Sequence, residues 1–160
     1  PQILFEDMYF QLSAGQLPGL AREFIDKIVY SLPKKWRKVI CPLLEYRYNT
    51  TKEVGWLTGA CLMVRQSAFL QANGFDEDLF MYFEDKDLCK RINVSGWQIM
   101  YCPLTSMIHL LAGSSGNVDK QKIKELYHTS QRYYYRKHLG RLQNAMVGWY
   151  LRITGKLQCR

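Results

Sequence analysis

The chain has 160 residues, enough to bury the hydrophobic core of one domain, and it carries a formal net charge of +8. Its composition, 48% hydrophobic and 22% charged, is that of a folded globular protein and excludes a disordered one. No apolar run reaches the ~20 residues that a membrane-spanning helix needs, so the sequence predicts no such helix.

The first third of the chain mixes apolar runs with turn signals. Residues 1–20 begin with Ile3-Leu4-Phe5 and end at Leu17-Pro18-Gly19, which predicts a strand followed by a turn. Residues 21–53 begin with apolar side chains at helical spacing, which predicts a helix. A basic loop interrupted by prolines should follow from Pro33.

Residues 54–112 carry the densest pattern. The apolar run from Val54 to Arg65 predicts a buried strand, and Ser67 is a plausible cap for a short helix that Asn73-Gly74 ends. Asp85 or Asp87 should start another helix, which Ser95-Gly96 ends. Residues 97–102 alternate like a strand. Strands and helices therefore alternate along the chain, which predicts an α/β architecture.

The last quarter of the chain holds the whole net charge. Residues 1–118 carry 12 basic and 12 acidic residues, whereas residues 119–160 carry 10 basic and two acidic ones. Residues 119–139 predict a basic helix that ends at Gly140, and residues 142–153 predict a second amphipathic helix. We therefore expect a division at 118/119, with a basic helical extension whose charge indicates an anionic partner.

An acidic-aromatic stretch, residues 75–87, is the best candidate for chemistry. Carboxylates held against an apolar wall become useful proton acceptors, while a helix N-terminus favours their ionised form. An EF-hand calcium loop does not fit, because Phe80 and Met81 stand where that loop needs an oxygen ligand and a glycine. From the residues alone, a helix-capping acidic turn with core aromatics stays open. The carboxylates are Asp76, Glu77, Asp78, Glu84, Asp85 and Asp87.

The order and spacing of several blocks resemble family-2 glycosyltransferases, especially the bacterial rhamnosyltransferase-like branch. The resemblance covers roughly residues 54–140 and continues through His109 to the run Tyr134–His138. It implies the C-terminal part of a GT-A (Rossmann-like) fold, a nucleotide-sugar donor, and inversion at the anomeric carbon. The blocks are WLTGACLMVR (56–65), NGFDE (73–77), FMYFEDKDLCKR (80–91) and GW (96–97).

The resemblance also implies roles for individual residues. Asp85 is the expected base that takes the proton of the acceptor hydroxyl, with Glu84 beside it as a hydrogen-bonding partner of the acceptor. Asp87 is expected to cap the helix or to orient Arg91, which is counted among the substrate-binding residues. The remaining substrate-binding residues are expected to be Trp56, Thr58, Gly59 and Ala60.

A divalent metal, Mg²⁺ or Mn²⁺, is implied as the group that stabilises the departing diphosphate. His109 is its expected ligand in this chain, and a diphosphate contact is the alternative. No Asp-x-Asp metal motif precedes the Thr58-Gly59-Ala60 block. We therefore expect this chain to be the acceptor-side half of a transferase, lacking most of the metal and nucleotide site and inactive alone.

The expected partners are a nucleotide-sugar donor, a saccharide acceptor that is lipid-linked, and an anionic membrane surface for residues 119–160. The five cysteines never form CxxC, which indicates a reducing cytoplasm. Two other functions are open to such a sequence: a non-catalytic scaffold, or a basic nucleic-acid-binding module. The second has no supporting motif, so no nucleic acid is expected.

Overall fold

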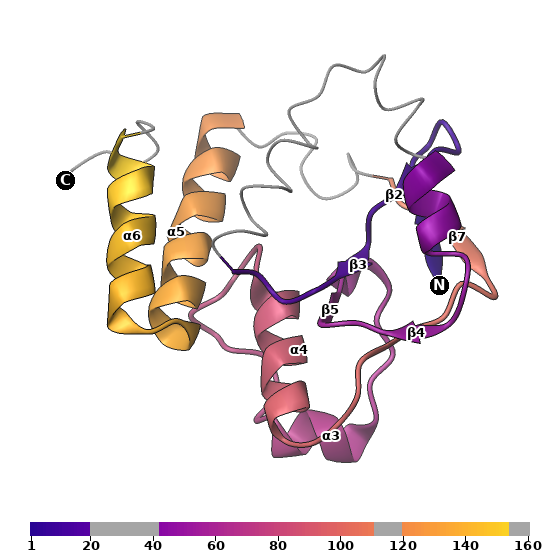
Figure 1. The fold of residues 1–160 in the computed structure, drawn as a ribbon, viewed down its shortest axis with the longest axis horizontal. Helices are drawn as coiled ribbons and strands as arrows, with labels where there is room; N and C mark the ends of the chain where they lie inside the picture. The colour runs from indigo at the N-terminus through magenta and orange to yellow at the C-terminus, as the bar shows by residue number, and fades with distance from the viewer. Residues whose placement is uncertain (20–41, 111–119, 154–160) are drawn as a thin grey trace.

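The computed structural model describes residues 1–19, 42–110 and 120–153. These residues form a mixed α/β structure, as the alternation in the sequence predicted. Figure 1 shows the helices α5 (Lys120–His138) and α6 (Arg141–Ile153) side by side at one end and the short strands at the other, with α4 (Glu84–Val94) between them. No helix in the described part of the chain is long and apolar enough to cross a membrane.

Short strands join segments that are far apart in the sequence. Strand β1 (Gln2–Leu4) pairs antiparallel with β2 (Phe10–Gln11) and parallel with β7 (Ser106–Ile108). Strand β3 (Ala14–Gly15) pairs with β5 (Trp56–Leu57), and β4 (Lys52–Glu53) pairs with β6 (Met100–Tyr101), both antiparallel. The single strand predicted for residues 1–20 is therefore three short strands.

The buried strand predicted over residues 54–65 is wrong beyond Leu57. Strand β3 offers register partners only to Trp56 and Leu57, and the chain then turns into the 3₁₀ helix η1 (Gly59–Cys61). Cys61 is exposed, and Met63 is 98% exposed. An apolar run without a neighbouring strand has no ladder to join, so this part becomes a surface connection.

The predicted helices agree with the structure more closely. Helix α3 (Gln66–Gln71) ends before Asn73 and Gly74, both at positive φ, as predicted. Ser67 lies inside α3, and the N-cap is Arg65 without a side-chain hydrogen bond, so the predicted cap is wrong. Helix α4 ends at Val94 with Ser95 as its C-cap, and α5 ends at His138 shortly before Gly140, as predicted. The start predicted for α4 at Asp85 or Asp87 is wrong, because the helix begins at Glu84 and its N-cap is Phe83, without a side-chain hydrogen bond.

Between residues 97 and 102, exposed Gln98 and Met100 alternate with buried Ile99 and Tyr101, although only β6 is paired. The helix predicted from residue 21 and the basic loop from Pro33 lie largely outside the described residues. Where description resumes, residues 42–47 are helical rather than a loop. The predicted division at 118/119 also falls outside the described residues.

Two hydrophobic cores hold the described residues together. The first core is gathered from segments between Phe10 and Tyr101 and includes Leu88, Cys89 and Ile92 of α4. The second core joins Leu79 and Phe83 of the acidic-aromatic stretch to α5 and α6, through Tyr134, Tyr135 and Val147. The chain thus passes from the second core at Leu79 and Phe83 directly into the first core along α4.

Candidate active site

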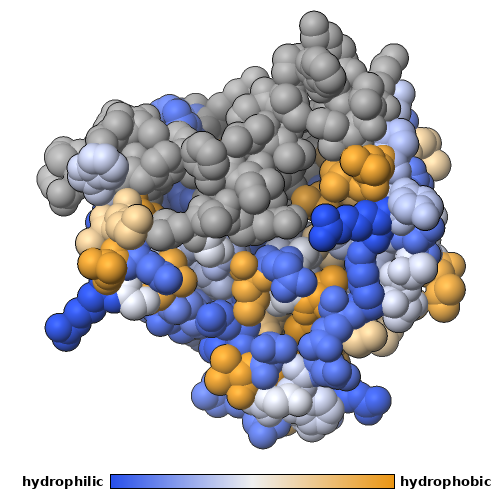
Figure 2. Space-filling view, in the orientation of Figure 1, coloured by the Kyte–Doolittle hydropathy of each residue, from blue (hydrophilic) through white to orange (hydrophobic). Residues whose placement is uncertain are grey.

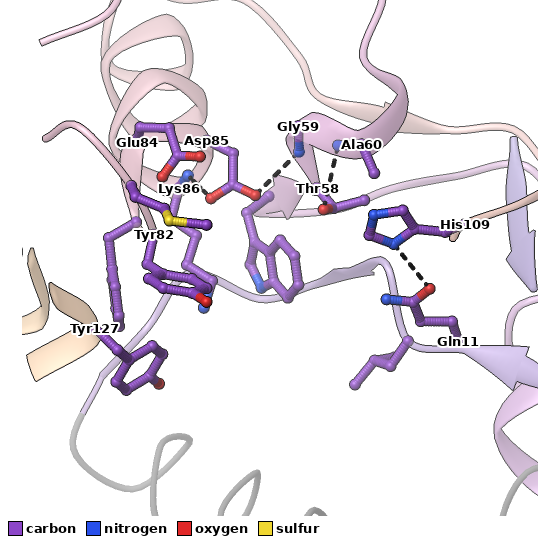
Figure 3. A pocket seen from close by; sticks show the side chains of 14 residues that line it. Gln11, Thr58, Gly59, Ala60, Tyr82, Glu84, Asp85, Lys86, His109 and Tyr127 are labelled. Carbon is purple, nitrogen blue, oxygen red and sulfur yellow. Dashed lines mark hydrogen bonds between the residues drawn. The ribbon is translucent and has the colours of Figure 1, made fainter. Parts of the chain in front are cut away.

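A pocket of about 430 Å³ opens between η1, the N-terminus of α4 and strand β2. It contains the Glu84-Asp85 pair, the Thr58-Gly59-Ala60 segment, Trp56 and His109, all of which sequence analysis had singled out separately (Figure 3). Strand pairing brings them together, because β3 pairs with β5 on one side and β1 with β7 on the other. The other lining residues are Gln11, Leu12, Met81, Tyr82, Phe83, Lys86 and Tyr127.

The carboxylate of Asp85 is fixed by backbone donors. Its Oδ2 accepts a hydrogen bond from the backbone N–H of Gly59 at 3.0 Å, and its Oδ1 accepts one from the N–H of Lys86 at 2.7 Å. A methyl group added at Gly59 would lie 3.7 Å from Asp85 Cβ, which is an ordinary contact. The fold therefore does not itself require glycine there, and the residue's small size leaves space on the pocket side.

Glu84 differs from its neighbour in its surroundings. Burial raises the pKa of its carboxyl group and the charge of Asp85 adds to this, while its own backbone N–H and Lys86 act in the opposite direction. Its Oε2 is buried and has no hydrogen-bond partner among the described residues. Such an atom is suited to bonding with a ligand hydroxyl group.

The turn before α4 has an unusual backbone. Tyr82 and Phe83 both adopt left-handed conformations, with φ of 66° and 65°, although neither is glycine. Such residues typically cost ~1–3 kcal/mol each and persist only where the surrounding structure holds them. Here the two strained residues come immediately before Glu84 and Asp85, and the turn that they form fixes the direction in which α4 presents these carboxylates to the pocket.

Helix α5 holds this turn in place. The Phe83 ring is 3% exposed and lies 5.4 Å from the ring centroids of both Tyr127 and Tyr134. The Ser130 hydroxyl donates a 2.6 Å hydrogen bond to the carbonyl oxygen of Met81. The basic helix is thus a wall of the pocket region as well as a carrier of positive charge.

Asp87 is fully buried behind the pocket and contacts two cationic side chains and a histidine. Arg91 Nη2 lies 2.7 Å from its Oδ2, while Lys137 Nζ and His138 Nε2 lie 2.9 and 2.5 Å from its Oδ1. Burial alone would raise the pKa of Asp87, but the hydrogen bonds from His138, Lys137 and Arg91 outweigh it and lower the pKa to about 2. Asp87 therefore joins α4 to α5.

Arg91 does not line this pocket, and its assignment to substrate binding stays a prediction. Its side chain donates to Asp87 Oδ2 and to the carbonyl oxygens of Ala72 and Gly74. The structure thus agrees with the expectation that Asp87 orients Arg91. Together they attach α4 to the end of α3, where the two carbonyl groups need donors.

His109 lies across the pocket from Asp85. Its Nδ1 is 3.2 Å from Gln11 Oε1, and its backbone N–H donates to the carbonyl oxygen of Leu4. Within residues 1–19, 42–110 and 120–153, no group of three His, Cys, Asp or Glu side chains is placed to hold a metal ion. His109 therefore stays a predicted ligand, without a second one from the described residues.

Sequence reasoning missed Lys86 and Tyr127. The Lys86 ammonium group lies over the rings of Trp56 and Phe83, 4.7 and 4.5 Å from their centroids. Trp56 was expected to stack on a sugar ring, and one of its partners is instead this lysine. A basic residue between Asp85 and Asp87 was the available signal, whereas Tyr127 comes from α5 and has no local signal.

The amino-acid sequence is similar to those of several proteins of known activity. The chain is 39% identical over 104 residues, 65% of its length, to the N-acetylglucosaminyl-diphospho-decaprenol L-rhamnosyltransferase of Mycobacterium tuberculosis. The chain is related to known rhamnosyltransferases. Rhamnosyltransferase WbbL of Escherichia coli is 45% identical over 56 residues, which are 35% of the chain and 21% of that protein. The resemblance to rhamnosyltransferases seen in the sequence is confirmed.

A more distant relative is a low-salt glycan biosynthesis hexosyltransferase of Haloferax volcanii, 30% identical over 70 residues, 44% of the chain and 23% of that protein. The match to the Mycobacterium tuberculosis protein covers 34% of its length, so the chain spans about a third of that relative. No family model matches the chain, and no solved structure matches it.

Proposed function

We propose that this chain is the acceptor-side part of an inverting glycosyltransferase with a GT-A-type fold. It would transfer a sugar from a nucleotide sugar to a hydroxyl group of a lipid-linked saccharide, and rhamnose is the first candidate for that sugar. The observation that carries the proposal is the meeting of Glu84, Asp85 and the Thr58-Gly59-Ala60 segment in one pocket, in a chain related to rhamnosyltransferases. The similarity to these rhamnosyltransferases leads us to propose a role in cell-wall or surface polysaccharide synthesis.

In the proposed reaction, the acceptor hydroxyl oxygen attacks the anomeric carbon while Asp85 takes the hydroxyl proton. The bond from that carbon to the diphosphate breaks, and its electron pair leaves with the diphosphate. Direct displacement inverts the anomeric carbon and needs one base, held within hydrogen-bond reach of the hydroxyl group. Asp85 suits this role because two backbone donors fix its carboxylate at the pocket wall.

Glu84 would hold the acceptor rather than take the proton. A carboxyl group with a raised pKa retains its proton to higher pH and can donate a hydrogen bond to a sugar oxygen. Its unpartnered Oε2 supports this division of work between the two neighbouring carboxyl groups.

A divalent ion, Mg²⁺ or Mn²⁺, would be held mainly by residues beyond this chain. When bound, it would neutralise charge on the departing diphosphate. The described residues do not form a metal site by themselves, and His109 is the candidate ligand that they offer. For the same reason we expect no transfer and no tight donor binding from the 160-residue chain alone.

Asp85→Asn in the full-length gene product tests the proposed base. We expect kcat to fall about 10²- to 10⁴-fold, with a much smaller change in KM. Glu77→Gln is the matched control, since Glu77 is an exposed residue of the same stretch outside the pocket. Activity of Asp85→Asn within about twofold of the parent would exclude Asp85 as the base.

The C-terminal helices would lie at the cytoplasmic face of an anionic membrane. Leu142, Met146 and Trp149 recur at helical spacing on α6 and are 78%, 54% and 68% exposed. Apolar side chains of this kind are visible over α6 at the left edge of the molecule in Figure 2. Arg132, Arg136 and Arg141 are exposed on α5 and at the start of α6. This combination suits an interfacial helix that meets acidic lipid.

A further inference from the structure

We propose that Lys86 is the anion-binding group of the pocket and that it contacts a phosphate group of the bound substrate. The inference rests on the proposed glycosyl transfer and adds a residue to it. Lys86 stands in the first turn of α4, directly after Asp85, and lines the same pocket (Figure 3).

The position of the ammonium group is the first observation. Lysine has a long, flexible side chain, but here its end is held over two aromatic faces, 4.7 Å from the Trp56 centroid and 4.5 Å from the Phe83 centroid. Both rings line the pocket, and Phe83 is itself fixed by the second core. The attraction of the rings for the cation thus keeps the charge at one wall of the pocket.

The charge balance is the second observation. Around the acidic-aromatic stretch, Arg91 is paired with Asp87, and Lys137 is paired with both Asp76 and Asp87. Lys86 makes no ion pair with any carboxylate of the described residues, although Glu84 and Asp85 are its neighbours in the chain. Ring faces attract the cation but leave its three N–H donors able to bond an anion. Lysine is a common ligand of phosphate.

The chemistry of the pocket requires such a cation if the substrate is anionic. Glu84 and Asp85 would repel a phosphate group that enters the same pocket of about 430 Å³. A positive charge next to Asp85 offsets this repulsion and draws the phosphate to its own wall. The carboxylate of Asp85 can then face the sugar hydroxyl group.

Two substrates of the proposed reaction contain such a group. One is the diphosphate of the nucleotide sugar, and the other is the diphosphate that joins an acceptor sugar to its lipid. The relative from Mycobacterium tuberculosis is named for an N-acetylglucosaminyl-diphospho-decaprenol, which contains a diphosphate of the second kind. The recognised chemistry is the same in both cases, so the experiment has to separate the two sources.

The test uses Lys86→Met and Lys86→Arg in the full-length gene product. Methionine keeps an apolar stem against the two rings, and arginine keeps the charge. KM is measured for the donor and for two acceptors, an N-acetylglucosaminyl diphospho-lipid and an alkyl glycoside of the same sugar without phosphate. Lys90→Met is the control, because Lys90 lies one turn further along α4 and outside the pocket.

A lost hydrogen bond to a charged group changes binding about tenfold or more. If Lys86 binds the acceptor, Lys86→Met raises KM for the diphospho-lipid by that factor and leaves the alkyl glycoside unchanged. If it binds the donor, donor KM rises with either acceptor. In both cases Lys86→Arg, which keeps the charge, should show only a small part of this rise in KM. Changes below about twofold in every KM would overturn the proposal. An equal rise in KM for both acceptors, with an unchanged donor KM, would also overturn it.

Binding of inorganic pyrophosphate, measured by calorimetry, separates this inference from the proposed function. Lys86→Met should weaken that binding about tenfold or more, and Lys90→Met should not. If Asp85→Asn keeps full activity while Lys86→Met still weakens pyrophosphate binding, the catalytic assignment fails and the phosphate contact stands. Unchanged pyrophosphate binding in Lys86→Met contradicts the phosphate contact, whatever Asp85→Asn does.

Discussion

The two hydrophobic cores differ in how they are assembled. The first draws on segments spread from Phe10 to Tyr101, whereas the second joins residues 79–83 to α5 and α6. The first core contains many aliphatic side chains around Leu88 and Ile92, and the second is dominated by tyrosines around Phe83. The difference shows that the pocket depends on both: the first core places Asp85 by anchoring α4, and the second fixes the turn that precedes it.

The junction between the cores is polar. Asp87 binds Arg91 on its own helix and Lys137 and His138 on α5. The Tyr133 hydroxyl group also lies within hydrogen-bond distance of Asp76 and Asp78, 3.1 and 3.0 Å from their Oδ2 atoms, and can donate its proton to either one, so α5 contacts the acidic-aromatic stretch at several points. A buried charge that loses a partner is costly, and this junction therefore couples α5 to α4 more strictly than apolar contact alone would.

The largest effect should come from removing Phe83. Phe83→Ala empties the centre of the second core and should lower the free energy of unfolding by about 3–5 kcal/mol. Phe80→Ala is a matched control from the same loop, because Phe80 is 87% exposed. It should change stability by less than about 0.5 kcal/mol. Urea denaturation followed by circular dichroism gives both values.

The same pair of variants tests whether the second core supports the pocket. If it does, Phe83→Ala should also lower kcat below the value for Phe80→Ala under conditions where both are folded. Equal kcat values would mean that the second core is an independent attachment to the first.

A smaller effect should appear in acid. The pKa of Asp87 is lowered from 3.8 to about 2 in the folded chain. The ionised carboxylate therefore contributes to the free energy of unfolding above about pH 4, and this contribution is lost as pH falls toward 2. That contribution is about 2 kcal/mol. Asp87→Asn should therefore be less stable than the parent at neutral pH, and the difference between their free energies of unfolding should become smaller below pH 4.

Unfolding free energies measured between pH 7 and pH 2.5 test this expectation. Asp7→Asn is the control, since Asp7 is exposed in a turn far from the junction. If the parent and Asp87→Asn curves run parallel through this range, the polar junction does not couple the cores as described.

The smallest effect on stability belongs to the outer face of α6. Trp149→Ser should change the free energy of unfolding by less than about 0.5 kcal/mol, because the side chain is exposed. It should nevertheless weaken co-sedimentation of the full-length protein with anionic vesicles. Tyr46→Ser, at a residue that is 75% exposed and away from α6, is the control. Equal binding of the parent to neutral and anionic vesicles would remove the electrostatic argument.

Much of the candidate site was accessible from the sequence. Glu84, Asp85 and the Thr58-Gly59-Ala60 segment were named from motif blocks, and the structure brings them into one pocket. Arg91 was grouped with them because of its position in the same block, but it lies outside the pocket and pairs with Asp87. Its spacing of four residues from Asp87 was the better guide, since such a pair lies on one face of a helix.

The sequence by itself determined most of the helix ends, because turn residues and apolar spacing act within a few residues of one another. It therefore predicted the end of α3 at Asn73-Gly74, the end of α4 at Ser95-Gly96 and the approximate ranges of α5 and α6. The predicted starts of α3 and α4 were wrong, since their N-caps are Arg65 and Phe83. Only the tertiary structure decided the strands, since each depends on a partner far away in the chain, as β1 does on β7. The same distant pairing decided that His109 faces Gln11, and packing against α5 decided that the Phe83 turn directs Asp85 and Lys86 to one pocket.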